Sequence, residues 1–298
     1  MGRRRRRSRL GDRATPNLGP PQRPSTPVGG HDRAWGSRRS LAGGFLLYRP
    51  ACRGHVARMR MPPAPTALLP DDAPLVFLVH GFLRTGASML PMAAGLRARG
   101  YRSSVVTQIN LHREIPDLAD SLFERVEGVR GRHEARTGLR PAAHFVTHSM
   151  GGIVVRSMLS RREVDGPNRC VLLAPPNKGS RLADHMRDRL GFPWGAFDPL
   201  AKLLPGERGQ CQNSGDPDAV VGIVVGTAAT GFTPPWRTLG GGFRLAADGE
   251  HDGTVAVDEA HLDSAADFAR VPYAHSLMML RRPVIDLTAR FLRDGRFE

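Results

Sequence analysis

From residue 74 onward, apolar positions follow two alternating patterns. Short runs rich in Val, Leu, Ile and Phe are typical of buried strands, and they lie at residues 75–79, 103–109, 144–148, 170–175, 219–227 and 267–272. Between them, apolar residues recur every three or four positions, which predicts helices at residues 88–101, 116–137, 151–162 and 281–294. This alternation predicts an α/β fold with a mostly parallel sheet and helices on both faces.

Residues 177–217 interrupt the alternation. They show no strand pattern, and their large apolar side chains stand among Gly and Pro: Phe192, Trp194, Phe197, Leu200, Leu203 and Leu204. An insertion of this length in a compact domain is more often functional or mobile than a simple connection. It could form a lid and an acyl pocket, or it could make ordinary core contacts beneath a long loop.

Charge is concentrated at the N-terminus. Residues 1–60 hold fifteen arginines and two acids, so they carry +13 of the chain's formal charge of +15. Their Pro, Gly and Ser content cannot bury enough apolar surface to offset the entropy of ordering, which predicts a disordered extension before a folded domain at residues 61–298. Its arginines could bind nucleic acid or acidic lipid. We favour a solvated extension, or translated upstream sequence with Met59 or Met61 as the true start.

The sequence offers few signals for export, membranes or metals. A twin arginine precedes an apolar run in "SRRSLAGGFLLYRPAC", but Gly43 and Gly44 interrupt that run, so a cytoplasmic location is favoured over export. No stretch reaches the roughly 18 apolar residues of a transmembrane segment. The nearly neutral body predicts no nucleic-acid partner. The cysteines, histidines and acids lack metal-ligand spacing, and three cysteines form no disulfide framework: Cys52, Cys170 and Cys211.

The stretch "HFVTHSMGG" at residues 144–152 places Ser149 where a buried strand ends and a helix begins. A nucleophilic serine at such a turn requires small neighbours two positions away, as in G-x-S-x-G. Gly151 satisfies this requirement, and Thr147 satisfies it less well. The helix N-terminus would also favour negative charge beside the serine. The alternative is a helix N-cap serine without chemistry.

A second candidate loop follows the first strand, in "VHGF" at residues 79–82. A tetrahedral oxyanion needs two converging donors, and the backbone N–H groups of Phe82 and Met150 could supply them. We expect His80 to fix this loop by hydrogen bonding and not to act as a base.

Five motifs in this order resemble the α/β-hydrolase superfamily, and more narrowly its bacterial lipase and carboxylesterase-type members: "LVHGF", "VTHSMGGIVVR", "LLAPPNKGS", "EHDGTVAV" and "YAHSLMM". The resemblance covers about residues 73–296. It implies a nucleophile at Ser149, an acid at Asp252, a base at His275 and no cofactor. Thr147 departs from the usual glycine. Some lipases of this kind carry structural calcium, a site whose oxygen ligands a single sequence does not reveal.

Other residues compete for the acid and base roles. His275 is preferred because it alone lies between the final strand and the final helix, with His261 as its main rival. His148 neighbours the nucleophile, but we expect its side chain to point to the other face of the strand. Asp252 precedes Gly253, which would let the loop turn sharply. Its rivals are Asp248 and Asp258.

These features predict a serine hydrolase that cleaves small-molecule or lipid esters through an acyl-enzyme, with transient contact to a lipid surface. The same machinery could run acyl transfer or amide cleavage, because fold and triad do not choose among these reactions. A binding protein that keeps the scaffold without the chemistry is the non-enzymatic alternative.

Overall fold

The computed structural model describes residues 69–108, 113–166, 168–190, 201–206, 209–228 and 249–298. All of them belong to the unit Met61–Glu298. The predicted extension of residues 1–60 lies outside the described residues, and so do four of the apolar residues of the insertion: Phe192, Trp194, Phe197 and Leu200.

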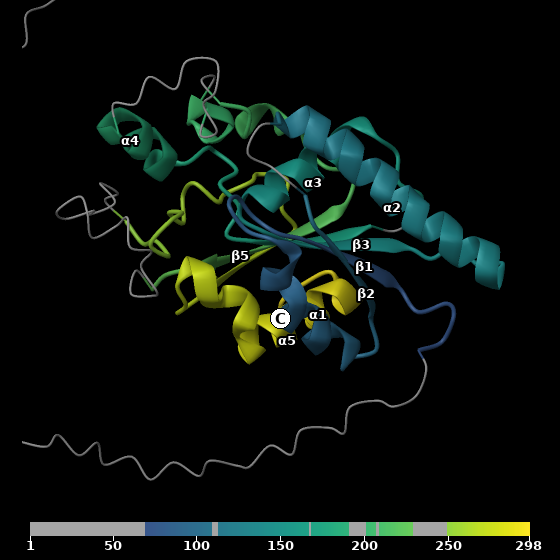
Figure 1. Cartoon of the computed structure of the whole chain (residues 1–298). Coiled ribbons are helices and arrows are strands. Elements are labelled where there is room, and N and C mark those ends of the chain that lie inside the picture. The colour runs from purple at the N-terminus through teal and green to yellow at the C-terminus, as the bar shows by residue number, and fades with distance from the viewer. Residues whose placement is uncertain (1–68, 109–112, 167, 191–200, 207–208, 229–248) are drawn as a thin grey trace, which may run out of the picture. The chain divides into compact units, whose positions relative to one another are not determined.

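Six strands form one sheet, and every strand pairing in it is parallel (Figure 1). The order is β2-β1-β3-β4-β5-β6. The strands are β1 (Leu75–Val79), β2 (Arg102–Val106), β3 (Ala143–His148), β4 (Arg169–Leu173), β5 (Val220–Gly226) and β6 (Asp267–Val271). Each was predicted from its apolar run. Because the strands are parallel, the loops that leave their carboxyl ends share one edge of the sheet.

In the described ranges, five α-helices accompany the strands, with α2 and α3 on one face of the sheet and α1 and α5 on the other (Figure 1). They are α1 (Leu90–Arg97), α2 (Ile115–Thr137), α3 (Met150–Arg161), α4 (Arg181–Leu190) and α5 (Arg282–Asp294). Short 3₁₀ turns lie at η1 (Gly86–Met89), η2 (Ala201–Leu203), η4 (Gln212–Ser214) and η6 (His275–Leu280). The α/β architecture with helices on both faces is therefore confirmed.

Helix α4 was not predicted. Six of its ten residues are charged or His, although Leu182, Met186 and Leu190 recur in "RLADHMRDRL" at the four-residue spacing of a helix. Side chains from outside the helix also stabilise its first turn. The Arg181 amide donates to Glu259 Oε1 at 2.7 Å, and the Ala183 amide donates to Ser180 Oγ at 3.2 Å. The first of these contacts comes from a residue far along the chain, so local sequence could not reveal it.

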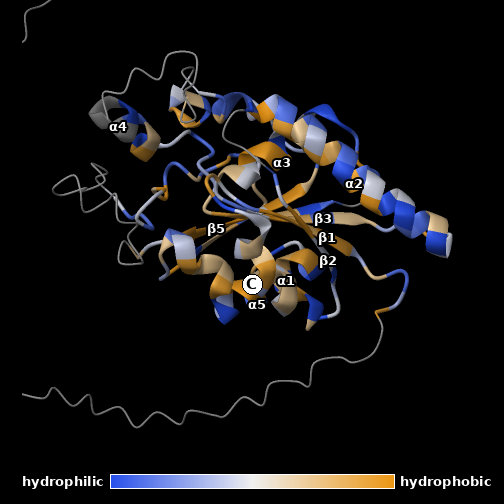
Figure 2. Ribbon diagram, viewed as in Figure 1, coloured by the Kyte–Doolittle hydropathy of each residue, from blue (hydrophilic) through white to orange (hydrophobic). Residues whose placement is uncertain are grey.

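The sheet separates two hydrophobic cores, as the alternation along β1 illustrates. Leu75, Phe77 and Val79 pack in the core formed with α2 and α3, whereas Val76 and Leu78 pack in the core formed with α1 and α5. All five side chains are buried, which explains why the strand reads as a continuous apolar run. Figure 2 shows apolar residues on the strands and on the helix surfaces that face them.

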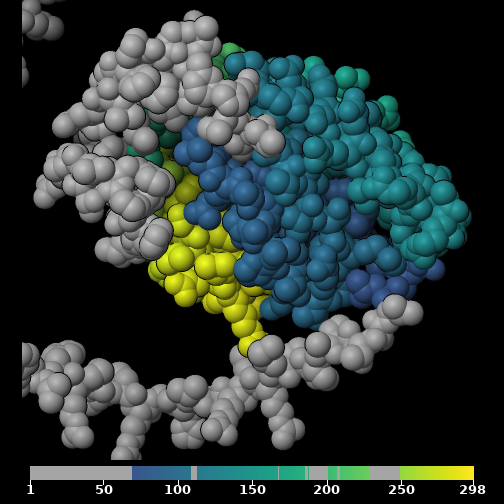
Figure 3. Space-filling view, in the orientation of Figure 1, coloured from purple at the N-terminus to yellow at the C-terminus, as the bar shows by residue number. Residues whose placement is uncertain are grey.

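Helices α1 and α5 lie side by side on their face of the sheet (Figure 3). A Cβ added at Gly95 would lie 2.6 Å from Ile285 Cγ2, so the missing side chain permits this close approach. Tyr101 Oη donates to the Ala289 carbonyl at 3.0 Å, and Arg99 Nε donates to Asp286 at 3.0 Å. The C-terminal helix is thereby attached to the early part of the domain.

Candidate active site

Ser149 links β3 to α3 in a backbone conformation that is rare for a residue with a side chain. Its φ is 55° and its ψ is −129°, and its amide donates to the Leu173 carbonyl at 2.8 Å. Backbone strain of this kind costs about 1–3 kcal/mol and is concentrated at functional sites. The sharp strand-to-helix turn predicted at this serine is present.

Small residues allow the chain to pass closely around this turn. A Cβ added at Gly151 would lie 2.7 Å from the carbonyl oxygens of Val79 and His80. A Cβ added at Gly81 would lie 2.8 Å from Ser149 Cβ. The loop after β1 therefore packs directly against the serine. Thr147 is fully buried, and its hydroxyl has no hydrogen-bond partner in the described part of the chain.

Asp252 and His275 form a buried hydrogen bond. Nδ1 of His275 lies 2.7 Å from Oδ2 of Asp252, and the two side chains are 8% and 1% exposed. Because a carboxylate can only accept, Nδ1 carries the proton and Nε2 remains the ring nitrogen with a free lone pair. The His275 amide also donates to the Asp252 carbonyl at 3.0 Å, so backbone and side chain hold the two residues together.

The other carboxylate oxygen of Asp252 is held by its own loop. Oδ1 accepts hydrogen bonds from the amides of Thr254 at 2.9 Å and Val255 at 2.8 Å. Gly226, the last residue of β5, makes room for this arrangement, because a Cβ there would lie 2.7 Å from Asp252 Cβ and 2.2 Å from the Tyr273 carbonyl oxygen. This role of Gly226 was not predicted, since the contact joins segments that are distant in the chain.

The Ser149 hydroxyl makes no hydrogen bond among the residues that the structure describes. The structure thus brings the predicted acid and base together, and the serine hydroxyl is not hydrogen-bonded to that pair. In ligand-free structures, hydrogen bonds between a nucleophile and its base are often long and tighten only with substrate bound.

His148 lies next to Ser149 in the chain and contacts the candidate base. Its ring packs against the ring of His275, with centroids 4.5 Å apart, a contact that was not predicted. Its Nε2 lies 2.9 Å from the His275 carbonyl oxygen. Burial, followed by the charge of His275, holds the pKa of His148 well below its usual value. A neutral ring with a committed Nε2 is unsuited to act as a base, which agrees with our choice of His275.

The two candidate oxyanion donors flank the turn at Ser149. Among the described residues, neither the Phe82 amide nor the Met150 amide donates a hydrogen bond to a protein acceptor. His80 supports the first of these loops as expected. Its Nε2 accepts from the Gln108 amide at 3.1 Å, so its Nδ1 carries the proton and donates to the Gly81 carbonyl at 2.8 Å. Burial lowers the pKa of His80, in keeping with a neutral ring.

The rival acids and bases are engaged elsewhere or lie outside the described residues. His261 Nε2 lies 3.1 Å from Asp263 Oδ1, and these side chains are 52% and 96% exposed. Asp258 pairs with Arg181 at 2.6 Å. Asp248 lies outside the residues that the structure describes. Of the candidate acids and bases, Asp252 and His275 are therefore the two that meet in a buried pair.

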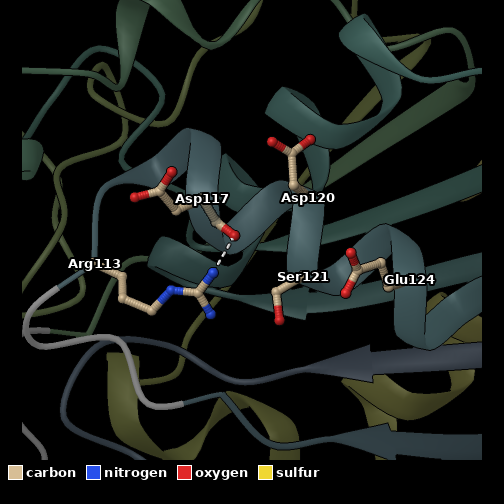
Figure 4. A pocket seen from close by; sticks show the side chains of 5 residues that line it. All are labelled: Arg113, Asp117, Asp120, Ser121 and Glu124. Atoms are coloured by element: carbon tan, nitrogen blue, oxygen red, sulfur yellow. Dashed lines mark hydrogen bonds between the residues drawn. The ribbon is translucent and has the colours of Figure 1, made fainter.

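A pocket of about 260 Å³ lies on α2, away from these residues (Figure 4). Its lining is entirely polar: Arg113, Asp117, Asp120, Ser121 and Glu124. Arg113 donates to the Asp117 carbonyl at 2.6 Å, and Asp120 pairs with Arg162 at 3.0 Å. Without apolar lining, this pocket does not suit an acyl chain.

No group of three or more His, Cys, Asp or Glu side chains in the described ranges could hold a metal ion. Within those ranges, no helix has the length and apolar content needed to cross a bilayer.

No protein-family model and no curated protein matches the sequence. Solved structures do match the fold. The mature form of the Bacillus licheniformis lipase BlEst2 has a TM-score of 0.55 and 23% identity, covering 70% of this chain and 87% of that chain. The propeptide form has a TM-score of 0.56 and 22% identity, covering 74% of this chain and 50% of that one. The chain has the α/β-hydrolase fold. In this fold, the candidate residues all lie at or after the carboxyl ends of parallel strands, where ligands bind.

Proposed function

We propose that the protein is a serine hydrolase that cleaves carboxylic esters through an acyl-enzyme. The observation that carries this proposal is the buried Asp252–His275 hydrogen bond beside the strained turn at Ser149. Nδ1 of His275 is committed to the acid, which fixes the tautomer whose Nε2 can accept a proton. The match to a protein described as a lipase supports the choice of esters over other substrates.

In the proposed reaction, His275 Nε2 takes the Ser149 proton as Oγ attacks the ester carbonyl carbon. Asp252 stabilises the resulting imidazolium. The Phe82 and Met150 amides donate to the oxyanion, and loss of one such donor typically lowers turnover by about 100- to 1,000-fold. Collapse of the tetrahedral intermediate transfers the proton from His275 to the leaving alcohol. Water then attacks the acyl group on Ser149, with His275 again as base, and releases the acid.

The substrate side of the proposal is broader. We propose a small-molecule or lipid ester that needs no cofactor, and an insertion at residues 177–217 that lines the acyl-binding region and contacts lipid surfaces transiently. Two residues of the insertion, Leu203 and Leu204, are buried in the described structure. A series of p-nitrophenyl esters of increasing chain length tests this role. A flat response from short to long chains would count against an acyl slot.

A fluorophosphonate probe tests the nucleophile and the base together. We expect the wild-type protein to be labelled on the peptide that contains Ser149, and labelling to disappear in Ser149→Ala and in His275→Ala. His261→Ala is the matched control, because that histidine pairs with Asp263 at the surface and should label normally. Ester hydrolysis by purified Ser149→Ala at the wild-type rate would rule out the proposal. An unlabelled but folded wild-type protein would favour a binding role, and acyl transfer to alcohols or amines would indicate a transferase.

A further inference from the structure

His148 contacts two functional parts of the site and is joined by a peptide bond to a third. Its Nε2 bonds to the His275 carbonyl at 2.9 Å, and its ring packs against the His275 ring. A Cβ added at Gly81 would lie 3.2 Å from His148 Nδ1, so the other side of the imidazole abuts the loop that leads to Phe82. The next residue is Ser149. One side chain therefore lies between the candidate base and the candidate oxyanion loop.

The hydrogen bonding of His148 defines its tautomer. A carbonyl oxygen can only accept, so Nε2 carries the proton and Nδ1 is a bare acceptor. Nδ1 is buried and has no hydrogen-bond partner in the described part of the chain. A buried acceptor without a partner costs about 1–3 kcal/mol. The only N–H group of the His148 ring donates to the His275 carbonyl, although this orientation leaves Nδ1 without a partner in the described part of the chain.

Two hydrogen bonds join the His275 backbone to other segments. Its amide donates to the Asp252 carbonyl, and its carbonyl, at the start of the 3₁₀ turn η6, accepts from His148. Within the described part of the chain, Nδ1 is the side-chain atom that makes a hydrogen bond, so packing must limit rotation of the ring. The adjacent ring of His148, tilted by 52°, supplies a packing surface of this kind. His148 therefore contacts both the backbone carbonyl and the imidazole ring of His275.

From this geometry, we propose that His148 is a positioning residue that sets the place of the His275 imidazole relative to Ser149 Oγ. The inference rests on the proposed function, and it adds a residue that acts through the base. A neutral imidazole suits this role, because a second positive charge 4.5 Å from His275 would oppose formation of the imidazolium during the reaction.

Two amide substitutions of different side-chain length test whether the hydrogen bond from residue 148 to the His275 carbonyl matters. In Gln the amide nitrogen can occupy the place of His Nε2 and donate to the His275 carbonyl, whereas the shorter Asn brings its nitrogen only to the place of Nδ1, facing Gly81. We expect His148→Gln to keep kcat within about threefold and His148→Asn to lower it by about 10- to 100-fold, since a misplacement of about 1 Å costs up to about 100-fold. KM should stay within about twofold in both variants, because neither change touches the substrate.

A spectroscopic readout separates positioning from general damage. The proton shared by His275 Nδ1 and Asp252 should give a downfield NMR resonance in the wild-type protein and in His148→Gln. The same resonance should broaden or vanish in His148→Asn while the thermal unfolding midpoints of the two variants stay alike. His148→Phe, which keeps a ring but has no N–H, should resemble His148→Asn if it folds. If it does not fold, the Gln and Asn pair decides.

Equal kcat in His148→Asn and the wild type, with the resonance intact, would overturn the positioning role. So would equal losses in His148→Gln and His148→Asn, because reach would then be irrelevant. If the wild-type protein hydrolyses no ester, the proposed function fails, and the NMR comparison alone still decides whether His148 positions His275.

Discussion

Replacing Asp252 with Asn probes the tautomer on which the mechanism depends. Oδ1 of Asp252 accepts from the amides of Thr254 and Val255, at 2.9 and 2.8 Å. An Asn side chain must choose which end faces these two donors. Turning its NH₂ toward them would leave both amides without an acceptor, at a cost of about 1–3 kcal/mol each. Turning its oxygen toward them leaves the NH₂ facing His275.

That second orientation reverses the hydrogen bond to the base. The NH₂ group of the substituted side chain donates to His275 Nδ1, so the proton of the ring moves to Nε2, which can then no longer accept the Ser149 proton. Loss of the correct tautomer in a triad lowers kcat by about 10⁴-fold, equivalent to about 5.5 kcal/mol of transition-state stabilisation. The two amide contacts thus predict that Asp252→Asn folds and binds substrate but turns over very slowly.

Steady-state kinetics with a p-nitrophenyl ester at neutral pH measures this loss, and ¹⁵N NMR of His275 reports which ring nitrogen carries the proton. Asp258→Asn is the matched control, because that acid is 67% exposed on the same loop and pairs with Arg181. Its kcat should change by less than about twofold. The reasoning fails if folded Asp252→Asn keeps more than about a tenth of wild-type kcat, or if Nδ1 of its His275 remains protonated.

Four further substitutions have expected outcomes. Gly226→Ala should lower both the activity and the urea midpoint, because the added Cβ would lie 2.2 Å from the Tyr273 carbonyl oxygen. At Gly131 an added Cβ would meet nothing within 4 Å, so Gly131→Ala should raise the stability by up to about 1 kcal/mol. Burial and the Arg169 charge lower the pKa of His144 to about 4, whereas in the unfolded chain this histidine titrates near its ordinary value of about 6.5. Between these two pH values only the unfolded chain takes up the proton, so the free energy of unfolding should fall as the pH drops through this window. In His144→Gln the fall should be smaller by about 3 kcal/mol. Arg156→Met should destabilise the fold by about 2–4 kcal/mol in urea titrations, because its buried guanidinium donates to three groups of the segment 177–215; a fall below about 1 kcal/mol would show that the segment is anchored elsewhere.

The sheet was predictable because its central strands are buried on both faces. β1 and β5 are continuous apolar runs, and each run in the sequence became a strand whose bounds differ from the prediction by a few residues. Helix α4 was missed because it lies within residues 177–217, which were interpreted as an insertion, although Leu182, Met186 and Leu190 have helical spacing. Its first turn is also held by Glu259, a residue more than seventy positions away. Local patterns carry no information about such a contact.

The site was predictable in part for a related reason. The turn at Ser149 is local, so small residues and chain order indicated it. Asp252 and His275 lie in separate loops, and their hydrogen bond depends on how both loops fold over the ends of β5 and β6. The contact between His148 and His275 was not predicted, because alternation along a strand says which face a side chain takes and not which loop covers that face. The catalytic roles of all these residues stay predictions.

The positive φ of Ser149 is a backbone conformation that lowers the stability of the fold for any residue with a side chain. Glycine would adopt this conformation without the penalty of a side chain, so Ser149→Gly should melt at a higher temperature than the wild type, and Ser149→Ala should not. Stability alone would therefore favour glycine over serine at this turn. The difference between the melting temperatures of Ser149→Gly and the wild type would measure how much stability the serine side chain removes.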